Sequence, residues 1–201
     1  MAKNNFTQIT TPKGKACYPH LRTTEVFDGE DSGKYACGIK LSPEESETLM
    51  ARIENEWEMA KKTPELDGKK FQRNSHPHLG YTEDNEGEIV FKAKTNAVIK
   101  TKAGEVIEKS VPVFDKYGKA MAADIEIGHG STIRLCILLR PFYASAAVYG
   151  VQLLLKAVQV LEYVEPSMGS VNPDDCGFDC LASDDEEANS IPFAAEADAD
   201  F

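Results

Sequence analysis

Basic side chains share one face of two segments whose residues alternate in the manner of β-strands. Lys92 and Lys94 occupy alternate positions of residues 88–95, and Arg134 and Arg140 share a face of residues 132–143. Successive side chains of a strand point to opposite sides of a sheet, so each pair is expected to reach solvent together. Cations so placed can neutralise the phosphates of a nucleic acid. We predict that these four residues bind nucleic acid; the alternative for each is a solvated surface charge.

More basic residues lie on segments that the sequence predicts to be connecting loops. They extend the predicted set of nucleic-acid-binding residues, and the alternative for each is again a solvated surface charge. They are Lys69, Lys70, Arg73, Lys100 and Lys102.

Exposed aromatic rings would add affinity for a single strand, because stacking contributes ~1–3 kcal/mol per base. Tyr117 lies between Lys116 and Lys119, and Tyr35 follows a lysine near a turn. We predict that these two tyrosines and Phe142 stack on bases.

Catalytic chemistry has little support, and we expect neither an enzyme nor a cofactor. The sequence has no GxSxG, Walker or HExxH motif. Asp124 and Glu126 alternate on a strand-like segment, as in metal-dependent nucleases, but no paired lysine follows them at useful spacing and a turn begins at Gly128. Magnesium-dependent loss of a DNA substrate would reveal a nuclease.

Metal binding is also not expected. Cys176 and Cys180 have the spacing of half a zinc site, but acidic residues surround them, and free thiols are the favoured reading. His76 and His78 have no carboxylate or thiol at ligand spacing, which favours a solvated loop. The odd number of scattered cysteines predicts reduced thiols.

The negative charge of the chain is concentrated at its end. The net charge is −11, but residues 166–201 hold ten acidic residues and no Lys or Arg, which leaves residues 1–165 close to neutral. We predict one domain over residues 1–165 and a disordered acidic tail over 166–201. About 36 flexible residues reach ~30–35 Å, enough to fold back over a basic surface. The predicted partner-binding residues of the tail are Asp184, Asp185, Glu186, Glu187, Asp198, Asp200 and Phe201.

The elements that must position the basic residues are mostly strands. Residues 16–27 and 33–41 predict an opening hairpin, residues 1–15 are expected to be loosely ordered, and residues 147–164 predict a last strand. Ser42, Pro43 and Glu45 predict a capped helix over 43–62 with Trp57 in its buried stripe. Phe91 is expected in the core.

These elements predict a mainly β protein: an OB-fold-like five-stranded barrel with one inserted helix and the acidic tail. A small closed barrel hides its strand edges, and the OB barrel is a frequent platform for single-stranded nucleic acid.

Four features in this order resemble the tailed-phage single-stranded DNA-binding proteins. They are residues 87–95 (GEIVFKAKT), the Gly-His-Gly-Ser turn at 128–131, residues 148–162 (VYGVQLLLKAVQVLE), and the acidic end in Asp-Phe. The resemblance is good from Gly87 to Phe201 and topological before that.

The resemblance implies a protein that coats single-stranded DNA without strong sequence preference during phage replication and recombination. It implies that the tail competes with DNA and recruits replication proteins such as a DNA polymerase or a helicase-primase. It places the protein in the cytoplasm of an infected bacterial host. No membrane association is expected, because the N-terminus lacks the apolar segment of a signal peptide and charged or polar residues interrupt the longest apolar stretches. A homodimer formed by exchange of tails remains open. The competing reading is an acidic interaction protein or DNA mimic that does not bind single-stranded DNA.

Overall fold

The computed structural model describes residues 6–73, 75–100 and 104–166, apart from the side chains of Phe27 and Lys100. These residues belong to one compact unit, Met1–Ser167, and the second unit, Met168–Phe201, lies outside the description. The predicted tail residues, Asp184 to Asp200 and Phe201, and the Cys176–Cys180 pair therefore lie outside the described residues.

The single helix of the described residues, α1, spans Pro43–Ala60. Its start is set by the predicted capping box, in which the Ser42 hydroxyl accepts a hydrogen bond from the Glu45 amide and the Glu45 side chain accepts one from the Ser42 amide. Leu49, Ile53 and Trp57 form its buried stripe. The predicted helix is confirmed, with an end two residues earlier than expected. No helix in the described part of the chain is long and apolar enough to cross a membrane.

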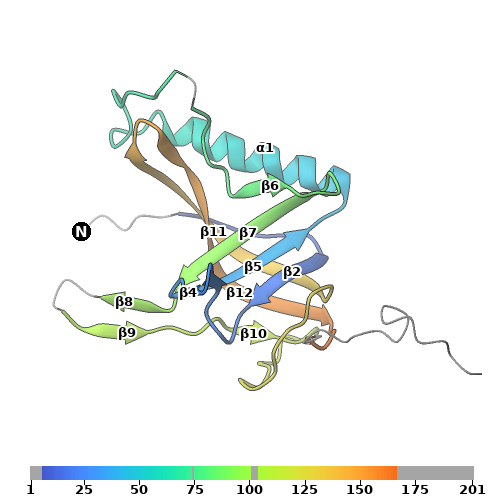
Figure 1. Ribbon diagram of the computed structural model, residues 1–201. Helices are drawn as coiled ribbons and strands as arrows, with labels where there is room; N and C mark the ends of the chain where they lie inside the picture. Colours follow the sequence, from blue (N-terminus) through green and yellow to red (C-terminus); the bar gives the residue numbers. More distant parts are fainter. Residues whose placement is uncertain (1–5, 74, 101–103, 167–201) are drawn as a thin grey trace, which may run out of the picture. The chain divides into compact units, whose positions relative to one another are not determined.

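Strands make up most of the remaining structure (Figure 1). Antiparallel pairs join β2 to β5, β5 to β7, β11 to β12 and β11 to β2, whereas β7 and β12 are parallel. The five strands β2, β5, β7, β12 and β11 are thus hydrogen-bonded in a closed ring. The strands are β1 (Thr7–Thr10), β2 (Gly14–His20), β3 (Val26–Phe27), β4 (Glu30–Asp31), β5 (Lys34–Lys40), β6 (Tyr81–Glu83), β7 (Ile89–Asn96), β8 (Val98–Lys100), β9 (Val106–Glu108), β10 (Val113–Phe114), β11 (Thr132–Ser145) and β12 (Val148–Glu162).

The ring with its inserted helix confirms the predicted fold class, mainly β and OB-like. The long hairpin of β11 and β12 supplies alternate buried side chains, among them Ile133, Leu135, Leu153 and Leu155, to one core. Helix α1 packs on this hairpin, where the Trp57 and Tyr149 rings stack with their centroids 5.5 Å apart. Trp57 is therefore a core residue, as predicted.

Two predictions for the first 33 residues are wrong. The segment expected to be loosely ordered contains β1, which pairs with β11, and the start of β2. The strand expected over residues 16–27 ends at His20, and its register slips between Cys17 and His20, where Tyr18 has a φ of 45°. Residues 21–33 instead form a connection that includes the small β3–β4 ladder.

The hairpin of β8 and β9 forms a separate two-stranded sheet, which extends away from the ring in Figure 1. The short β10 then pairs in parallel with β12. The sequence predicts one strand over residues 105–113 as the second arm of this hairpin, but these residues divide between β9 and the start of β10.

Candidate nucleic-acid interface

Two adjoining clefts lie over β7, β11 and β12, and we call them together the basic groove. They have volumes of ≈ 240 and ≈ 290 Å³ and share Lys94 and Gln152 as lining residues. The five cations that line the groove are Lys34, Lys92, Lys94, Lys109 and Arg140. No carboxylate is among the described residues that line either cleft.

Strand register explains why these cations meet. On β7, Phe91 and Ala93 are buried, so the alternate Lys92 and Lys94 face outward, as predicted for this strand. Lys94 pairs with Leu154 of β12, and Gln152, two residues earlier on β12, pairs with Arg140 of β11. The ring closure between β7 and β12 therefore brings a lysine and an arginine that are 46 positions apart in the sequence into one cleft.

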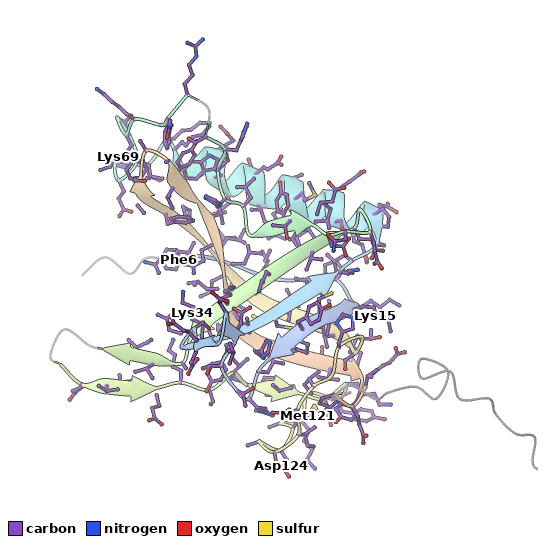
Figure 2. All side chains as sticks on the ribbon, viewed as in Figure 1. Phe6, Lys15, Lys34, Lys69, Met121 and Asp124 are labelled. Atoms are coloured by element: carbon purple, nitrogen blue, oxygen red, sulfur yellow. The ribbon has the colours of Figure 1, made fainter. Side chains whose placement is uncertain are left out.

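Lys34 and Lys109 complete the groove from the ends of neighbouring elements. Lys34 begins β5 opposite Asn96 of β7, and it lies near the start of the β8–β9 hairpin in Figure 2. Lys109 follows β9, where its backbone amide donates a hydrogen bond to the Ala97 carbonyl at 2.7 Å. The sequence prediction did not include either residue.

Phe142 lies at the end of the groove beside Lys92 and Lys94. It is paired with Gly150 across β11 and β12, and its ring is partly exposed. Phe142 also lines a neighbouring cleft of ≈ 730 Å³ near the end of α1, together with Phe6 and Tyr143. The groove thus combines cations with an accessible aromatic ring, the two components of a single-strand binding surface.

His78 also lines the groove, although the sequence predicted only a solvated loop for it. Its backbone is fixed against β12, since its amide donates to the Tyr149 carbonyl and its carbonyl accepts from the Val151 amide, both at 2.8 Å. His76 and His78 side chains are exposed, and neither belongs to a metal-ligand cluster of the described residues.

The largely buried side chain of Glu25 contacts two of the groove lysines. Its carboxylate accepts hydrogen bonds from Lys92 Nζ at 2.5 Å and Lys94 Nζ at 2.8 Å. Burial alone would raise the pKa of Glu25, but the hydrogen bonds and charges of the two lysines outweigh it and lower the pKa to about 2. Glu25 therefore carries a full negative charge at neutral pH. The sequence offered no signal for this contact, because it depends on how residues 21–33 fold over the sheet.

Of the predicted DNA-binding residues that the structure describes, the others do not line the basic groove. Arg134 donates from Nε to the Thr11 carbonyl at 3.2 Å and lines a separate cleft beside α1 with Lys13 and Arg52. Although Arg134 and Arg140 share one face of β11, their separation of six positions corresponds to ~20 Å of strand. They cannot line the same short cleft.

The predicted residues of the 69–73 loop lie at the other end of the hairpin. Lys69 Nζ is 5.4 Å from the centre of the Tyr143 ring, and the Tyr143 hydroxyl donates to the Lys70 carbonyl at 2.9 Å. Figure 2 shows Lys69 beside the turn between β11 and β12, away from Lys34. Arg73 is exposed on the same loop.

The remaining predicted residues have varied environments. Tyr117 is 82% exposed, with Lys116 Nζ 5.1 Å from its ring centre, but it lies on the loop after β10. Tyr35 is partly buried and packs against the core, one position before the β5 residue that pairs with Lys94. The side chain of Lys100 and all of Lys102 lie outside the described residues.

Acidic residues of the described chain give no support to a nuclease centre. Asp124 and Glu126 lie on a loop, not on the strand-like segment that the sequence predicted, and Figure 2 shows Asp124 far from Lys34. Asp84, Glu86 and Glu88 do cluster, but Lys40 Nζ lies 2.6, 3.0 and 2.8 Å from their carboxylates. The lysine ammonium group occupies the position that a metal cation would take.

The ring of strands and its groove place the protein in the class of OB-like β folds. The chain belongs to the family described as "Single-stranded DNA-binding protein, Bacteriophage T7", whose model matches residues 29–163, about two thirds of the sequence. The predicted resemblance to phage single-stranded DNA-binding proteins is thereby confirmed.

Solved structures of phage proteins share the fold. The crystal structure of gp2.5, a single-stranded DNA-binding protein of bacteriophage T7, has 20% identity and a TM-score of 0.60 over 86% of this chain and 99% of that chain. The single-stranded DNA-binding protein of bacteriophage Enc34 has 16% identity and a TM-score of 0.57 over 85% and 89%. Its complex with single-stranded DNA has 16% identity and a TM-score of 0.56 over 80% and 89%. No curated protein sequence matches the chain significantly.

Proposed function

We propose that this protein binds single-stranded DNA in the basic groove, without strong sequence preference. The observation that carries the proposal is the gathering of five cations and Phe142 in one groove with no carboxylate among its described lining residues. Membership of the phage single-stranded DNA-binding family and the fold shared with the Enc34 protein, which was solved with single-stranded DNA, support it.

The chemistry of the groove accounts for binding that tolerates any sequence. Lysine and arginine contact phosphates, which are the same for every base, and an aromatic ring stacks on any base. Binding weakens as salt rises, because the groove cations displace counterions from the DNA. For a single strand, log K falls with the logarithm of the salt concentration by a slope of about 0.7 for each phosphate contact. A duplex pairs and stacks its bases internally, so it gains nothing from Phe142 and is expected to bind more weakly.

The proposed biological role is the coating of single strands during phage DNA replication and recombination, in the cytoplasm of an infected bacterial host. The protein acts as a binding protein and not as an enzyme. The acidic residues after position 165 compete with DNA, and they recruit replication proteins once DNA has displaced them. This part of the proposal rests on the charge of the sequence and on the family. A version that ends at Glu165 is then expected to bind a single strand more tightly than the full chain.

Fluorescence anisotropy of a labelled oligo-dT tests the assignment of the groove. Lys109→Met removes a groove cation that makes no described ion pair, and it is expected to lower affinity and to reduce the salt slope by about 0.7. Lys62→Met is the matched control, because Lys62 is exposed just after α1 and lines neither cleft. Equal effects of the two substitutions would contradict the groove assignment.

The competing function is an acidic interaction protein that mimics DNA. It predicts binding to a basic protein and no binding to oligo-dT at any salt concentration. The same titration therefore separates the two functions. Incubation of the oligonucleotide with magnesium in parallel would reveal any nuclease activity as a loss of full-length substrate.

A further inference from the structure

Glu25 is held at the groove by its backbone as well as by its side chain. The Glu25 amide donates to the Lys34 carbonyl at 2.8 Å, and the Glu25 carbonyl accepts from the Ser32 amide at 2.9 Å. Between these two bonds, the β3–β4 ladder pairs Val26 with Asp31. The position of the carboxylate is therefore built into the connection formed by residues 21–33.

Burial differs between the three charged groups of this cluster. The Glu25 side chain is only 10% exposed, whereas the side chains of Lys92 and Lys94 are 48% and 35% exposed. The carboxylate thus lies beneath the two ammonium groups, which face the groove. Each ammonium group has three N–H donors, and the described contacts use one of each on Glu25. Donors remain on both lysines for a phosphate that approaches from the groove.

We propose that Glu25 limits the affinity of the groove for a single strand by neutralising one of the two charges of Lys92 and Lys94, and that it stays in place when DNA binds. The inference rests on the proposed function and adds a residue that sets its strength. The cluster of Lys92, Lys94 and Glu25 has a net charge of +1, so it offers phosphates one uncompensated charge where its two lysines alone would offer two.

Retention of Glu25 follows from its burial and from its backbone contacts. To leave, the carboxylate would have to break both lysine contacts and the connection of residues 21–33 would have to open. Departure would also leave two ammonium groups side by side without a counter-charge until a phosphate arrived. A phosphate can instead bind the free donors with the cluster intact.

The salt dependence of binding tests the proposal with the full chain and oligo-dT between about 25 and 200 mM salt. Glu25→Gln keeps the shape of the side chain but removes its charge. If Glu25 stays in place, the variant has one more uncompensated cation, and its log–log salt slope is expected to be steeper by about 0.7. The ratio of the variant's binding constant to that of the native chain then changes about fourfold across this salt range. Glu30→Gln is the matched control, since Glu30 is exposed on the same connection and makes no described contact with either lysine.

A second pair of variants checks the charge count independently. Lys94→Met leaves the cluster neutral and is expected to reduce the slope by about 0.7, whereas Glu25→Gln combined with Lys94→Met returns the net charge to +1 and the slope to the native value. Circular dichroism checks that each variant folds. If Glu25→Gln alone does not fold, the double variant still tests the charge count, because it removes a cation together with its partner.

Three outcomes would overturn the proposal. Tighter binding of Glu25→Gln with an unchanged slope means that DNA displaces Glu25 and gains both lysines in the native protein. Weaker binding of this variant means that Glu25 serves to orient the lysines. An equal effect of Glu30→Gln means that only the overall charge matters. Failure of the proposed function is distinct from these, because then the native chain and every variant leave oligo-dT unbound.

Discussion

Gly150 is the point where the segment before β6 attaches to β12, and its replacement by alanine makes a sharp prediction. A Cβ atom at this position would lie 1.9 Å from the His78 carbonyl oxygen, and the φ of 145° is one that side chains rarely adopt. Gly150→Ala must therefore push His78 away from β12, with loss of the hydrogen bonds from the His78 amide to the Tyr149 carbonyl and from the Val151 amide to the His78 carbonyl.

The size of the effect follows from these contacts. Two backbone hydrogen bonds contribute about 1–3 kcal/mol net, and a strained φ costs about 1–3 kcal/mol. A loss of about 2–6 kcal/mol lowers the Tm of a chain of this size by roughly 4–24 °C, at about 2–4 °C per kcal/mol. Because His78 and Phe142 line the same part of the groove, affinity for oligo-dT is expected to fall as well.

Thermal unfolding followed by circular dichroism measures this loss. Gly118→Ala is the control, because Gly118 has a φ of 79° but a Cβ atom added there would meet no atom within 4 Å beyond its chain neighbours. It has the backbone strain without the clash, so Gly150→Ala is expected to lower the Tm markedly more. Equal shifts would refute the role of the His78 contact.

Three other predictions concern the ion cluster of Glu25, the buried Trp57 and the cap of α1. Glu25 has a folded-state pKa of about 2, below its ordinary value, so its contribution to stability, on the order of 2 kcal/mol, is present above about pH 4.5 and is lost as the pH falls toward 2. Urea midpoints of the native chain and of Glu25→Gln should therefore differ at neutral pH and converge as the pH falls toward the folded-state pKa; a constant difference would contradict the ion cluster. Trp57 is 4% exposed and stacked on Tyr149, so oligo-dT should quench its fluorescence little, whereas strong quenching would make it a stacking platform. Ser42→Ala removes the helix cap and should cost about 1 kcal/mol of stability in chemical denaturation, and no loss would mean that the cap is dispensable.

Local sequence patterns correctly predicted those features that depend only on residues a few positions apart in the chain. The capping box predicted the start of α1, and alternation predicted that Phe91 is buried and that Lys92 and Lys94 face outward. These features depend on chemistry within a few positions, which a single sequence displays. The family resemblance then indicated how such strands combine.

Long-range pairing accounts for what the sequence could not predict. Residue Lys94 reaches Arg140 only because β7 and β12 close the ring through the Lys94–Leu154 pair. Glu25 reaches Lys92 and Lys94 only because residues 21–33 form a connection that is held by the hydrogen bonds of the Glu25 backbone to Lys34 and Ser32. No spacing in the sequence indicates either contact. The sequence therefore predicted a basic binding surface, but not which residues together form it.

The most direct test of this account is the binding of labelled oligo-dT and of the matching duplex to the full chain over a range of salt. The groove has five cations and one contacting carboxylate, Glu25, so about four phosphates are neutralised and the log–log slope for the single strand should be about −3. The account predicts this slope together with weaker binding of the duplex. Absence of single-strand binding, or binding that does not change with salt, would contradict it.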